Sequence, residues 1–341
     1  IEVPQGAIRL NTDSQKLEFF AQDRWYEMAT DSPLLAESSQ DNVSLGARGI
    51  FGTGTTPGTN DFIGFINIAS SGDEQDFGDA VAQAQGASAG LSSRTRGIFA
   101  GGQQTSPYNH IHFVTIAQKG DSIDFGDLAN GRSFCEGASN QTRGIIAGGI
   151  VYPSGNRINI TEFVTIASTG NSLDFGDLTV GRAQCRGVSN GTRAIFACGQ
   201  SPTKVNTIDF FMIGTLGNAS DFGDSTIATD GQASGCNAIR GIYAGGSPHG
   251  NDDQKVIEFI TMATRGNATN FGELSVQRSF AGGVSSPTRS VFAGGYGSPA
   301  SNHLTTIDYI NNMTGGDAID FGDQSVNRDQ MGSFSNAHGG L

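Results

Sequence analysis

The sequence predicts an all-β protein, a six-bladed β-propeller with a small β-meander on its N-terminal side. Three observations support this prediction. A basic residue, a short apolar run and a glycine doublet recur six times at spacings of 47–50 residues. A second phrase, Asp-Phe-Gly-Asp or a close variant, recurs in step with the first. Each period holds four short apolar segments and none with helical periodicity, which is the pattern of propeller blades.

Composition narrows the classes of partner. The 341 residues carry a formal net charge of −13. A nucleic-acid partner needs a basic face, so this charge argues against one. The apolar runs are only a few residues long, so we expect no membrane-spanning helix. Cys135 and Cys185 occupy equivalent positions in neighbouring repeats, and we expect small buried side chains there rather than a disulfide.

Residues 1–30 differ from the repeats. Segments 6–13, 16–20 and 25–28 predict three short strands separated by turn residues. A meander of this size is not stable alone, so we expect residues 1–30 to be an attachment or oligomerisation module. Residues 31–47 are polar and predict a connector to the propeller at 48–341.

One repeat illustrates the expected blade. It predicts strands at 132–139, 143–147, 161–167 and 173–178, with a loop of variable length between the second and third. The last segment, 328–336, matches a first strand but no further strands follow it. We therefore expect it to complete the first blade and close the propeller.

The repeats resemble kelch repeats. The resemblance rests on the glycine doublet, as in Gly148-Gly149, and on the arginine that opens the first strand, as in Arg132. It covers residues 48–341 and implies the propeller fold, not a function. Kelch blades usually carry a tryptophan late in the blade, whereas these repeats carry Phe77, Phe125, Phe175, Phe222, Phe271 and Phe321.

The N-terminal segment resembles a short module of tail-fibre and other virion proteins of tailed bacteriophages. The matching residues are Gly6-Ala7-Ile8-Arg9-Leu10-Asn11-Thr12-Asp13, Lys16-Leu17-Glu18-Phe19-Phe20 and Trp25, although an aromatic is commoner at Leu10. The resemblance implies a structural protein on the virion surface. It also implies that residues 1–30 bind other virion proteins or further copies of the chain as a homo-oligomer.

The loops between the second and third strands are the part that does not repeat. Alternate connections of a propeller lie on opposite faces, so all six loops share one rim. Aromatic and polar side chains on such loops suit recognition of a host-surface glycan or protein, although neutral drift of solvated loops is an equal alternative. The candidate binding residues are Tyr108, His110, Tyr152, Arg157, Lys204, His249, Asp252, Asp253, Tyr296 and His303.

Other recurring residues favour structural roles. The Asp-Phe-Gly-Asp phrase predicts a turn held by carboxylate-to-backbone bonds, with calcium binding as the minor alternative. We expect the six second-strand arginines to pair with aspartates of this phrase rather than form an anion-binding ring. His110 and His112 stand two residues apart, a spacing that chance explains better than a site. We recognise no catalytic, metal or cofactor motif and expect no enzymatic activity.

These observations rank four functions. The first is a tail fibre or related host-recognition appendage of a tailed phage, which binds its receptor through the loop rim. The second is a head-decoration or head-fibre protein without a receptor role. The third is an appendage enzyme that degrades polysaccharide, since paired carboxylates could meet across blades. The fourth is a cellular adhesin or lectin.

Overall fold

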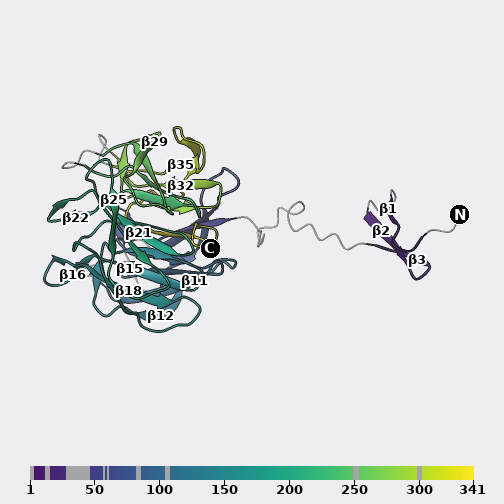
Figure 1. Cartoon of the computed structure of the whole chain (residues 1–341), viewed down its shortest axis with the longest axis horizontal. Coiled ribbons are helices and arrows are strands. Elements are labelled where there is room, and N and C mark those ends of the chain that lie inside the picture. Colours follow the sequence, from purple (N-terminus) through teal and green to yellow (C-terminus); the bar gives the residue numbers. More distant parts are fainter. Residues whose placement is uncertain are drawn as a thin grey trace. The chain divides into compact units, whose positions relative to one another are not determined.

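The computed structural model is all-β, with no helix among the residues that it describes (Figure 1). The chain divides into two compact units, residues 1–45 and 46–341. The predicted connector lies outside the described residues, except for Ala47. The described residues are 4–11, 16–27, 47–56, 58–59, 61–81, 86–103, 108–248, 253–297 and 302–341.

The first unit contains a three-stranded antiparallel meander. Strands β1 (Ile8–Asn11), β2 (Lys16–Ala21) and β3 (Arg24–Glu27) pair in that order. Gln22 and Asp23 both have positive φ, which is the turn geometry that matches the twist of a two-residue hairpin. The three strands predicted from the sequence are confirmed.

Aromatic side chains hold the meander together. Phe19 stacks on Tyr26 with ring centroids 5.5 Å apart, and Phe20 meets Trp25 at 5.3 Å. The Arg9 guanidinium lies 4.1 Å from the Trp25 ring centroid. Such cross-strand pairs stabilise a sheet by roughly 0.2–1 kcal/mol each, which is too little to make an isolated meander stable.

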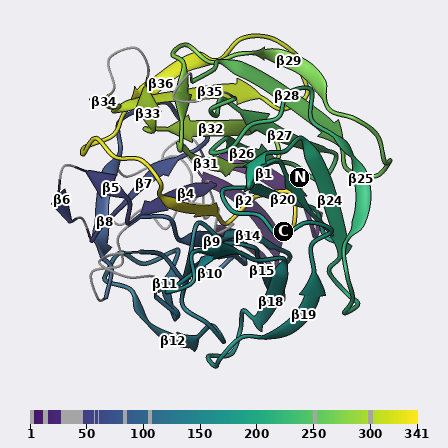
Figure 2. The ribbon, with the colours of Figure 1, turned by 90° about the vertical axis from the view of Figure 1, so that its left-hand side faces the viewer.

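The described part of the second unit contains six four-stranded antiparallel sheets, a β-propeller-like fold. They surround a common centre, with the first strand of each sheet nearest to it and the fourth at the periphery (Figure 2). From centre to periphery the sheets are β37 (Gly332–Ser335), β4 (Arg48–Gly52), β7 (Phe62–Asn67) and β8 (Gln75–Asp79); β9 (Ala89–Ser92), β10 (Arg96–Ala100), β11 (His110–Thr115) and β12 (Ile123–Asp127); β14 (Glu136–Ser139), β15 (Arg143–Ala147), β18 (Ile160–Thr165) and β19 (Leu173–Asp177); β20 (Arg186–Ser189), β21 (Arg193–Ala197), β24 (Thr207–Met212) and β25 (Ser220–Asp224); β26 (Ala233–Cys236), β27 (Arg240–Ala244), β28 (Val256–Thr261) and β29 (Thr269–Glu273); β31 (Gly282–Ser285), β32 (Arg289–Ala293), β35 (Thr306–Asn311) and β36 (Ile319–Asp323).

The two ends of this unit meet in one sheet. In β37 and β4, Gly332 pairs with Gly52, and Ser335 with Gly49. The C-terminal strand is therefore shorter than the predicted segment 328–336, but it occupies the innermost position of the sheet that also holds β4, β7 and β8.

Four of the six predicted variable loops contain short hairpins in the part of the chain that the structure describes. Their strands are β5 (Thr55–Thr56) with β6 (Gly58–Thr59), β16 (Ile150–Val151) with β17 (Asn156–Arg157), β22 (Gln200–Ser201) with β23 (Thr203–Lys204), and β33 (Tyr296–Gly297) with β34 (Asn302–His303). Two hairpins gain a third strand, β13 (Arg132–Ser133) on β16 and β30 (Arg278–Ser279) on β33. The expectation of one strand over 132–139 is wrong, because Phe134 takes a left-handed conformation that separates β13 from β14.

The core lies between neighbouring sheets. The phenylalanine of each Asp-Phe-Gly-Asp phrase is only 2–6% exposed. Phe175 of β19, for example, packs with Phe196 and Phe211 of the next sheet. Full burial of such a side chain contributes about 1.5–3 kcal/mol, so each sheet depends on its neighbour for stability.

The Asp-Phe-Gly-Asp phrases join the outer strands into a belt. The backbone N–H of the fourth residue donates to a side-chain oxygen in the turn of the next sheet, at 3.0–3.1 Å. The donor residues are Asp79, Asp127, Asp177, Asp224, Glu273 and Asp323, and the acceptors in the same order are Asp121, Asn171, Asn218, Asn267, Asp317 and Asp73. The phrase is thus a turn element held by carboxylate or carboxamide bonds, with the oxygen supplied by the neighbouring repeat.

The six second-strand arginines have different partners from those predicted. Each donates to a backbone carbonyl of the next sheet, as Arg143 does to Ile213 at 2.7 Å. Each guanidinium also lies over an aromatic ring of its own sheet, as Arg143 does over Phe163 at 4.6 Å. The expected pairing with aspartates is corrected, because the stem follows the apolar surface between sheets and carries the charge to a carbonyl instead.

The first-strand arginines form the buried ion pairs. Four of them are completely buried, and each faces a carboxylate. The pairs are Arg132–Glu162 at 3.5 Å, Arg182–Asp209 at 3.1 Å, Arg278–Asp308 at 2.9 Å, and Arg328–Glu74. Burial raises the pKa of Glu74, while the positive charge of Arg328 opposes that rise. Removing one partner of such a pair leaves a buried charge and costs roughly 3–5 kcal/mol.

Candidate binding site at one end of the central channel

Six residues that precede the inner strands form a circuit of backbone hydrogen bonds. Each N–H donates to the carbonyl of the equivalent residue in the neighbouring sheet, at 2.5–3.2 Å, and the sixth bond returns to the first residue. We call this circuit the backbone ring. Its members are Ala87, Phe134, Gln184, Gly231, Phe280 and Gln330. The ring fixes the position of all six sheets around the centre.

The backbone ring requires an uncommon conformation. All six residues have φ between 53° and 64°, and five of them are not glycine. A left-handed conformation of a residue with a side chain costs of order 1 kcal/mol, and it persists only where the surrounding structure imposes it. The ring bonds impose it here, and they direct the side chains of Gln184, Phe280 and Gln330 to one end of the channel.

A cavity of about 460 Å³ lies at this end of the channel. The hairpins and the backbone ring together supply its lining. Among the lining side chains are Lys204, Asp230, Asp253, Phe280, Tyr296 and Asp329. A volume in the range of about 300–1,000 Å³ with a few convergent polar groups is typical of small-molecule sites.

Lys204 is held on one side of the cavity. Its Nζ lies 3.2 Å from Oδ1 of Asp230. The same ammonium donates to the carbonyl of Ser247 at 2.6 Å and to its Oγ at 2.9 Å. Burial raises the pKa of Asp230, and the charge of Lys204 opposes that rise. The cation of the cavity is therefore neutralised by its own acidic neighbour.

Asp329 lies on another side of the cavity and is only 4% exposed. Its Oδ1 is 3.5 Å from Nδ1 of His303 and receives no hydrogen bond from the described residues. Burial raises the pKa of Asp329 to about 7 and lowers that of His303. The site thus holds a buried carboxyl oxygen that can still accept a hydrogen bond.

The structure brings only some of the predicted residues to this cavity. Lys204, Asp253 and Tyr296 line it. Two others touch its lining: Arg157 donates from Nη2 to Oε1 of Gln200 at 2.6 Å, and His303 faces Asp329.

The remaining predicted residues lie elsewhere or are not described. Tyr152 is 60% exposed beside the β16–β17 hairpin. His110 faces Asp127 at 3.3 Å, and Tyr108 lies beside His110 with ring centroids 5.7 Å apart. His249 and Asp252 lie outside the described residues.

Sequence reasoning missed Asp230, Phe280 and Asp329. Phe280 is a member of the backbone ring, and Asp230 and Asp329 immediately precede the ring members Gly231 and Gln330. A signal was present. The second position after the first-strand arginine holds Phe134, Gln184, Phe280 and Gln330 in four repeats, so it varies although its surroundings recur.

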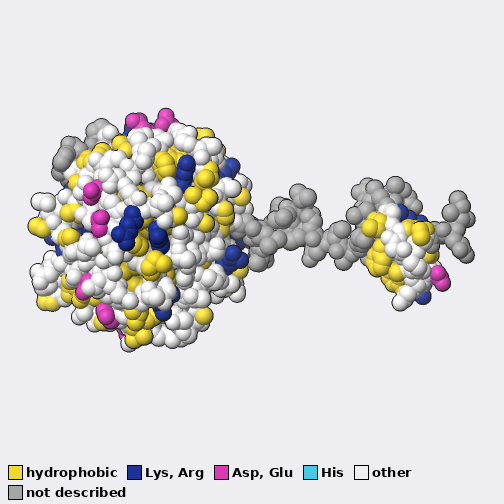
Figure 3. Space-filling model, viewed as in Figure 1, with side chains coloured by type: hydrophobic (Ala, Val, Ile, Leu, Met, Phe, Trp, Pro, Cys, Tyr) yellow, Lys and Arg dark blue, Asp and Glu magenta, His cyan; other side chains and the backbone are white. Residues whose placement is uncertain are grey.

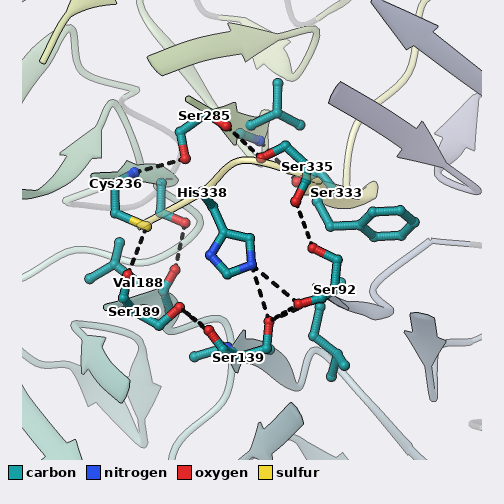
Figure 4. Close-up of a pocket in the computed structure, with 18 of the residues that line it drawn as sticks. Ser92, Ser139, Val188, Ser189, Cys236, Ser285, Ser333, Ser335 and His338 are labelled. Carbon is teal, nitrogen blue, oxygen red and sulfur yellow. Dashed lines mark hydrogen bonds between the residues drawn. The ribbon is translucent and has the colours of Figure 1, made fainter. Parts of the chain in front are cut away.

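The other end of the channel is lined by a second set of equivalent residues, which we call the serine ring: Ser92, Ser139, Ser189, Cys236, Ser285 and Ser335. Four of the serine hydroxyls donate to the carbonyl of the preceding ring member at 2.5–2.8 Å, and the thiol of Cys236 lies 3.3 Å from the carbonyl of Ser189. In Figure 4 these side chains surround His338.

His338 blocks the serine-ring end. Its Nε2 lies 3.3 Å from both the Ser92 carbonyl and Oγ of Ser139. Burial lowers the pKa of His338 to about 4, so its imidazole is neutral at pH 7. The remaining cavity is only about 50 Å³. Figure 1 shows the C-terminus on the side of this unit opposite to β16 and β22.

Other candidate chemistry is accounted for by packing. His112 is buried against Phe99 and bonds Oγ of Ser122 at 2.9 Å, so it forms no common site with His110. All four cysteines are buried and unbridged, as predicted for Cys135 and Cys185. Among the described residues no group of three or more His, Cys, Asp or Glu could hold a metal ion.

The surface of the second unit carries charges of both signs. On the face shown in Figure 3, the second unit carries basic and acidic side chains scattered among uncharged ones. No helix in the described part of the chain is long and apolar enough to cross a bilayer. Comparison with protein-family models and with curated proteins finds no match.

Proposed function

We propose that the six four-stranded sheets are the blades of a closed, kelch-like propeller. The pairing of β37 with β4 supports this proposal, as does the backbone ring, whose bonds run from sheet to sheet and return to their start. The buried first-strand arginines are compatible with the kelch resemblance, while phenylalanine in place of the late-blade tryptophan is its main departure.

We infer that the protein is a virion component of a tailed phage. It recognises its host through the end of the central channel that holds the 460 Å³ cavity, which we call the mouth. The observation that carries this inference is the contrast between repeated scaffold and non-repeated mouth. Arginine contacts and the outer belt recur from sheet to sheet, whereas the hairpins and cavity side chains differ. The assignment to a virion rests on the resemblance of residues 6–25.

Binding, rather than catalysis, suits the cavity. Lys204 is engaged by Asp230 and Ser247, and Asp329 lies beside His303. A rigid lining of paired charges, amides and aromatic rings provides orientation and specificity. The Ser247 hydroxyl beside the cavity accepts a hydrogen bond from the Lys204 ammonium, and that ammonium is engaged by Asp230 rather than available as a general base.

The test is adsorption. The full chain, labelled and purified, is incubated with cells of the host bacterium and then used to compete with phage adsorption. Saturable binding and competition are expected, and hairpin variants that retain the wild-type melting temperature should weaken both. If the chain does not bind and electron microscopy places it on the head, it is a decoration protein. Release of reducing ends from host polysaccharide would instead establish an enzyme.

A further inference from the structure

The chemistry of the cavity indicates which ligands it can accept. Amide groups come from Gln184, Gln200 and Gln330, and hydroxyls from Ser247 and Ser279. These groups both donate and accept hydrogen bonds, so they can pair with the hydroxyls of a polyol in either direction. Such a lining is a poor environment for a purely apolar ligand, because its buried polar groups would lose their partners.

The charges of the cavity are predominantly acidic. The lining includes Asp230, Asp253 and Asp329 but one cation, Lys204, and a second cation, Arg157, lies behind the lining against Gln200. Lys204 is already paired with Asp230 and bonded to Ser247. A ligand with a carboxylate, sulfate or phosphate would therefore face the buried carboxyl group of Asp329 while Lys204 is already engaged, whereas a neutral or cationic ligand would not be repelled.

Two aromatic rings provide apolar surface. Phe280 and Tyr296 are half-buried and both line the cavity. The ring of Phe280 lies over Gly231, where a Cβ would come within 2.7 Å of it. Glycine at this position of the backbone ring therefore makes room for the aromatic side chain. An aromatic ring beside hydrogen-bonding groups matches a sugar, which has an apolar face and a polar edge.

Asp329 supplies an observation independent of the acidic cluster. Asp329 is only 4% exposed, and its Oδ1 receives no hydrogen bond from the described residues. A buried acceptor without a donor costs about 1–3 kcal/mol, and a ligand hydroxyl or ammonium would remove that cost. The ionisable side chain that faces Asp329 is His303, whose Nδ1 lies 3.5 Å away.

We propose that this cavity binds one residue of a saccharide that carries no negative charge, a neutral or amino sugar, with Asp329 as the hydrogen-bond acceptor. The proposal rests on the proposed function, because it makes the cavity the receptor site of the host-recognition mouth. Phe280 or Tyr296 packs on the apolar face of the sugar, and the glutamines pair with its remaining hydroxyls.

The test uses the full chain and titration calorimetry with defined oligosaccharides. The probes end in glucose, N-acetylglucosamine, glucosamine, glucuronic acid or N-acetylneuraminic acid. We expect binding of at least one neutral or amino sugar and at least about tenfold weaker binding of both acidic sugars. Asp329→Asn should weaken saccharide binding about tenfold, because the amide lacks the second acceptor oxygen. Asp221→Asn is the matched control on exposed β25 and should change nothing.

Parallel cell-binding measurements separate this proposal from the proposed function. Equal or tighter binding of acidic sugars, or wild-type saccharide affinity in a folded Asp329→Asn protein, would overturn the cavity assignment. Cell binding that survives Asp329→Asn without any saccharide binding would also overturn it, yet leave host recognition intact. Saccharide binding without cell binding would do the reverse, since the site would stand and host recognition would fail.

Discussion

Each end of the central channel is formed by a ring of residues that are equivalent in the six repeats, but only one end holds a large cavity. At one end the backbone ring leaves a cavity of about 460 Å³ surrounded by dissimilar side chains. At the other, five serines and Cys236 form a nearly uniform ring that His338 fills. The inner strands connect the two rings, whose members lie five residues apart in every repeat.

This difference shows where the repeats could vary. The backbone ring is made by main-chain atoms, so its side chains are free to differ between sheets. The serine ring is made by side chains, so its members must stay small and hydrogen-bonding, and one thiol is tolerated. The side chains at the backbone-ring end can therefore differ, because main-chain atoms make its hydrogen bonds. We infer that recognition uses that end.

The largest expected effect on stability comes from removing one member of each ring at once. Deletion of residues 328–341 removes Gln330, Ser335, the buried Arg328–Glu74 pair and strand β37. It also removes Phe334, which is 4% exposed, and so uncovers Phe99, whose ring centroid lies 4.8 Å from that of Phe334. We expect a loss of more than about 5 kcal/mol of unfolding free energy, or failure to fold.

Thermal melting followed by circular dichroism measures this effect. Deletion of residues 337–341 is the control, because it removes His338 but keeps β37 and both rings. A melting temperature unchanged by the longer deletion would mean that the C-terminal strand does not close the propeller.

The cavity end should be destabilised by high pH. The pKa of Asp329 is raised from 3.8 to about 7 by burial, so the folded state resists ionisation. Stability should therefore fall as pH rises from about 4 to about 7 and remain reduced above that. Asp329→Asn should be more stable than the wild type by about 2–4 kcal/mol at pH 8 and show no gain near pH 4. Urea unfolding at both pH values measures the difference, and an equal effect at both would contradict it.

The conformation of the backbone ring can be tested at one position. Gln184 has φ near 60°, which a β-branched residue rarely adopts. Gln184→Val should cost about 1–3 kcal/mol, whereas Gln184→Gly should be nearly neutral because glycine adopts this conformation freely. Chemical denaturation compares the two variants. Equal stability would show that the ring does not impose a left-handed conformation.

The serine-ring end should respond to pH in the opposite direction. The pKa of His338 is lowered from 6.5 to about 4, so the unfolded chain takes up its proton first as the pH falls. Wild-type stability should decline between about pH 6.5 and 4, by about 1 kcal/mol for this partly exposed residue. His338→Gln should lack that decline in urea titrations. A variant with the same slope as the wild type would place the titrating group elsewhere.

The repeat and its strands could be predicted from the amino-acid pattern alone. A strand over 143–147 was predicted and is β15, and the three strands of residues 1–30 were also predicted. Periodicity, glycine positions and apolar runs are local signals, so they survive without tertiary information. Burial of Cys135 and Cys185 followed from the same logic, because residues at equivalent repeat positions share one environment.

The contacts between repeats could not be predicted in this way. Arg143 was expected to bond an aspartate, yet its partner is the carbonyl of Ile213 in the next sheet. Asp329 and Lys204 line one cavity although 125 residues separate them, and His338 reaches the serine ring from the end of the chain. Such contacts depend on the distances between sheets, and these are set by packing around the centre. A pattern that repeats every 47–50 residues contains no information about those distances.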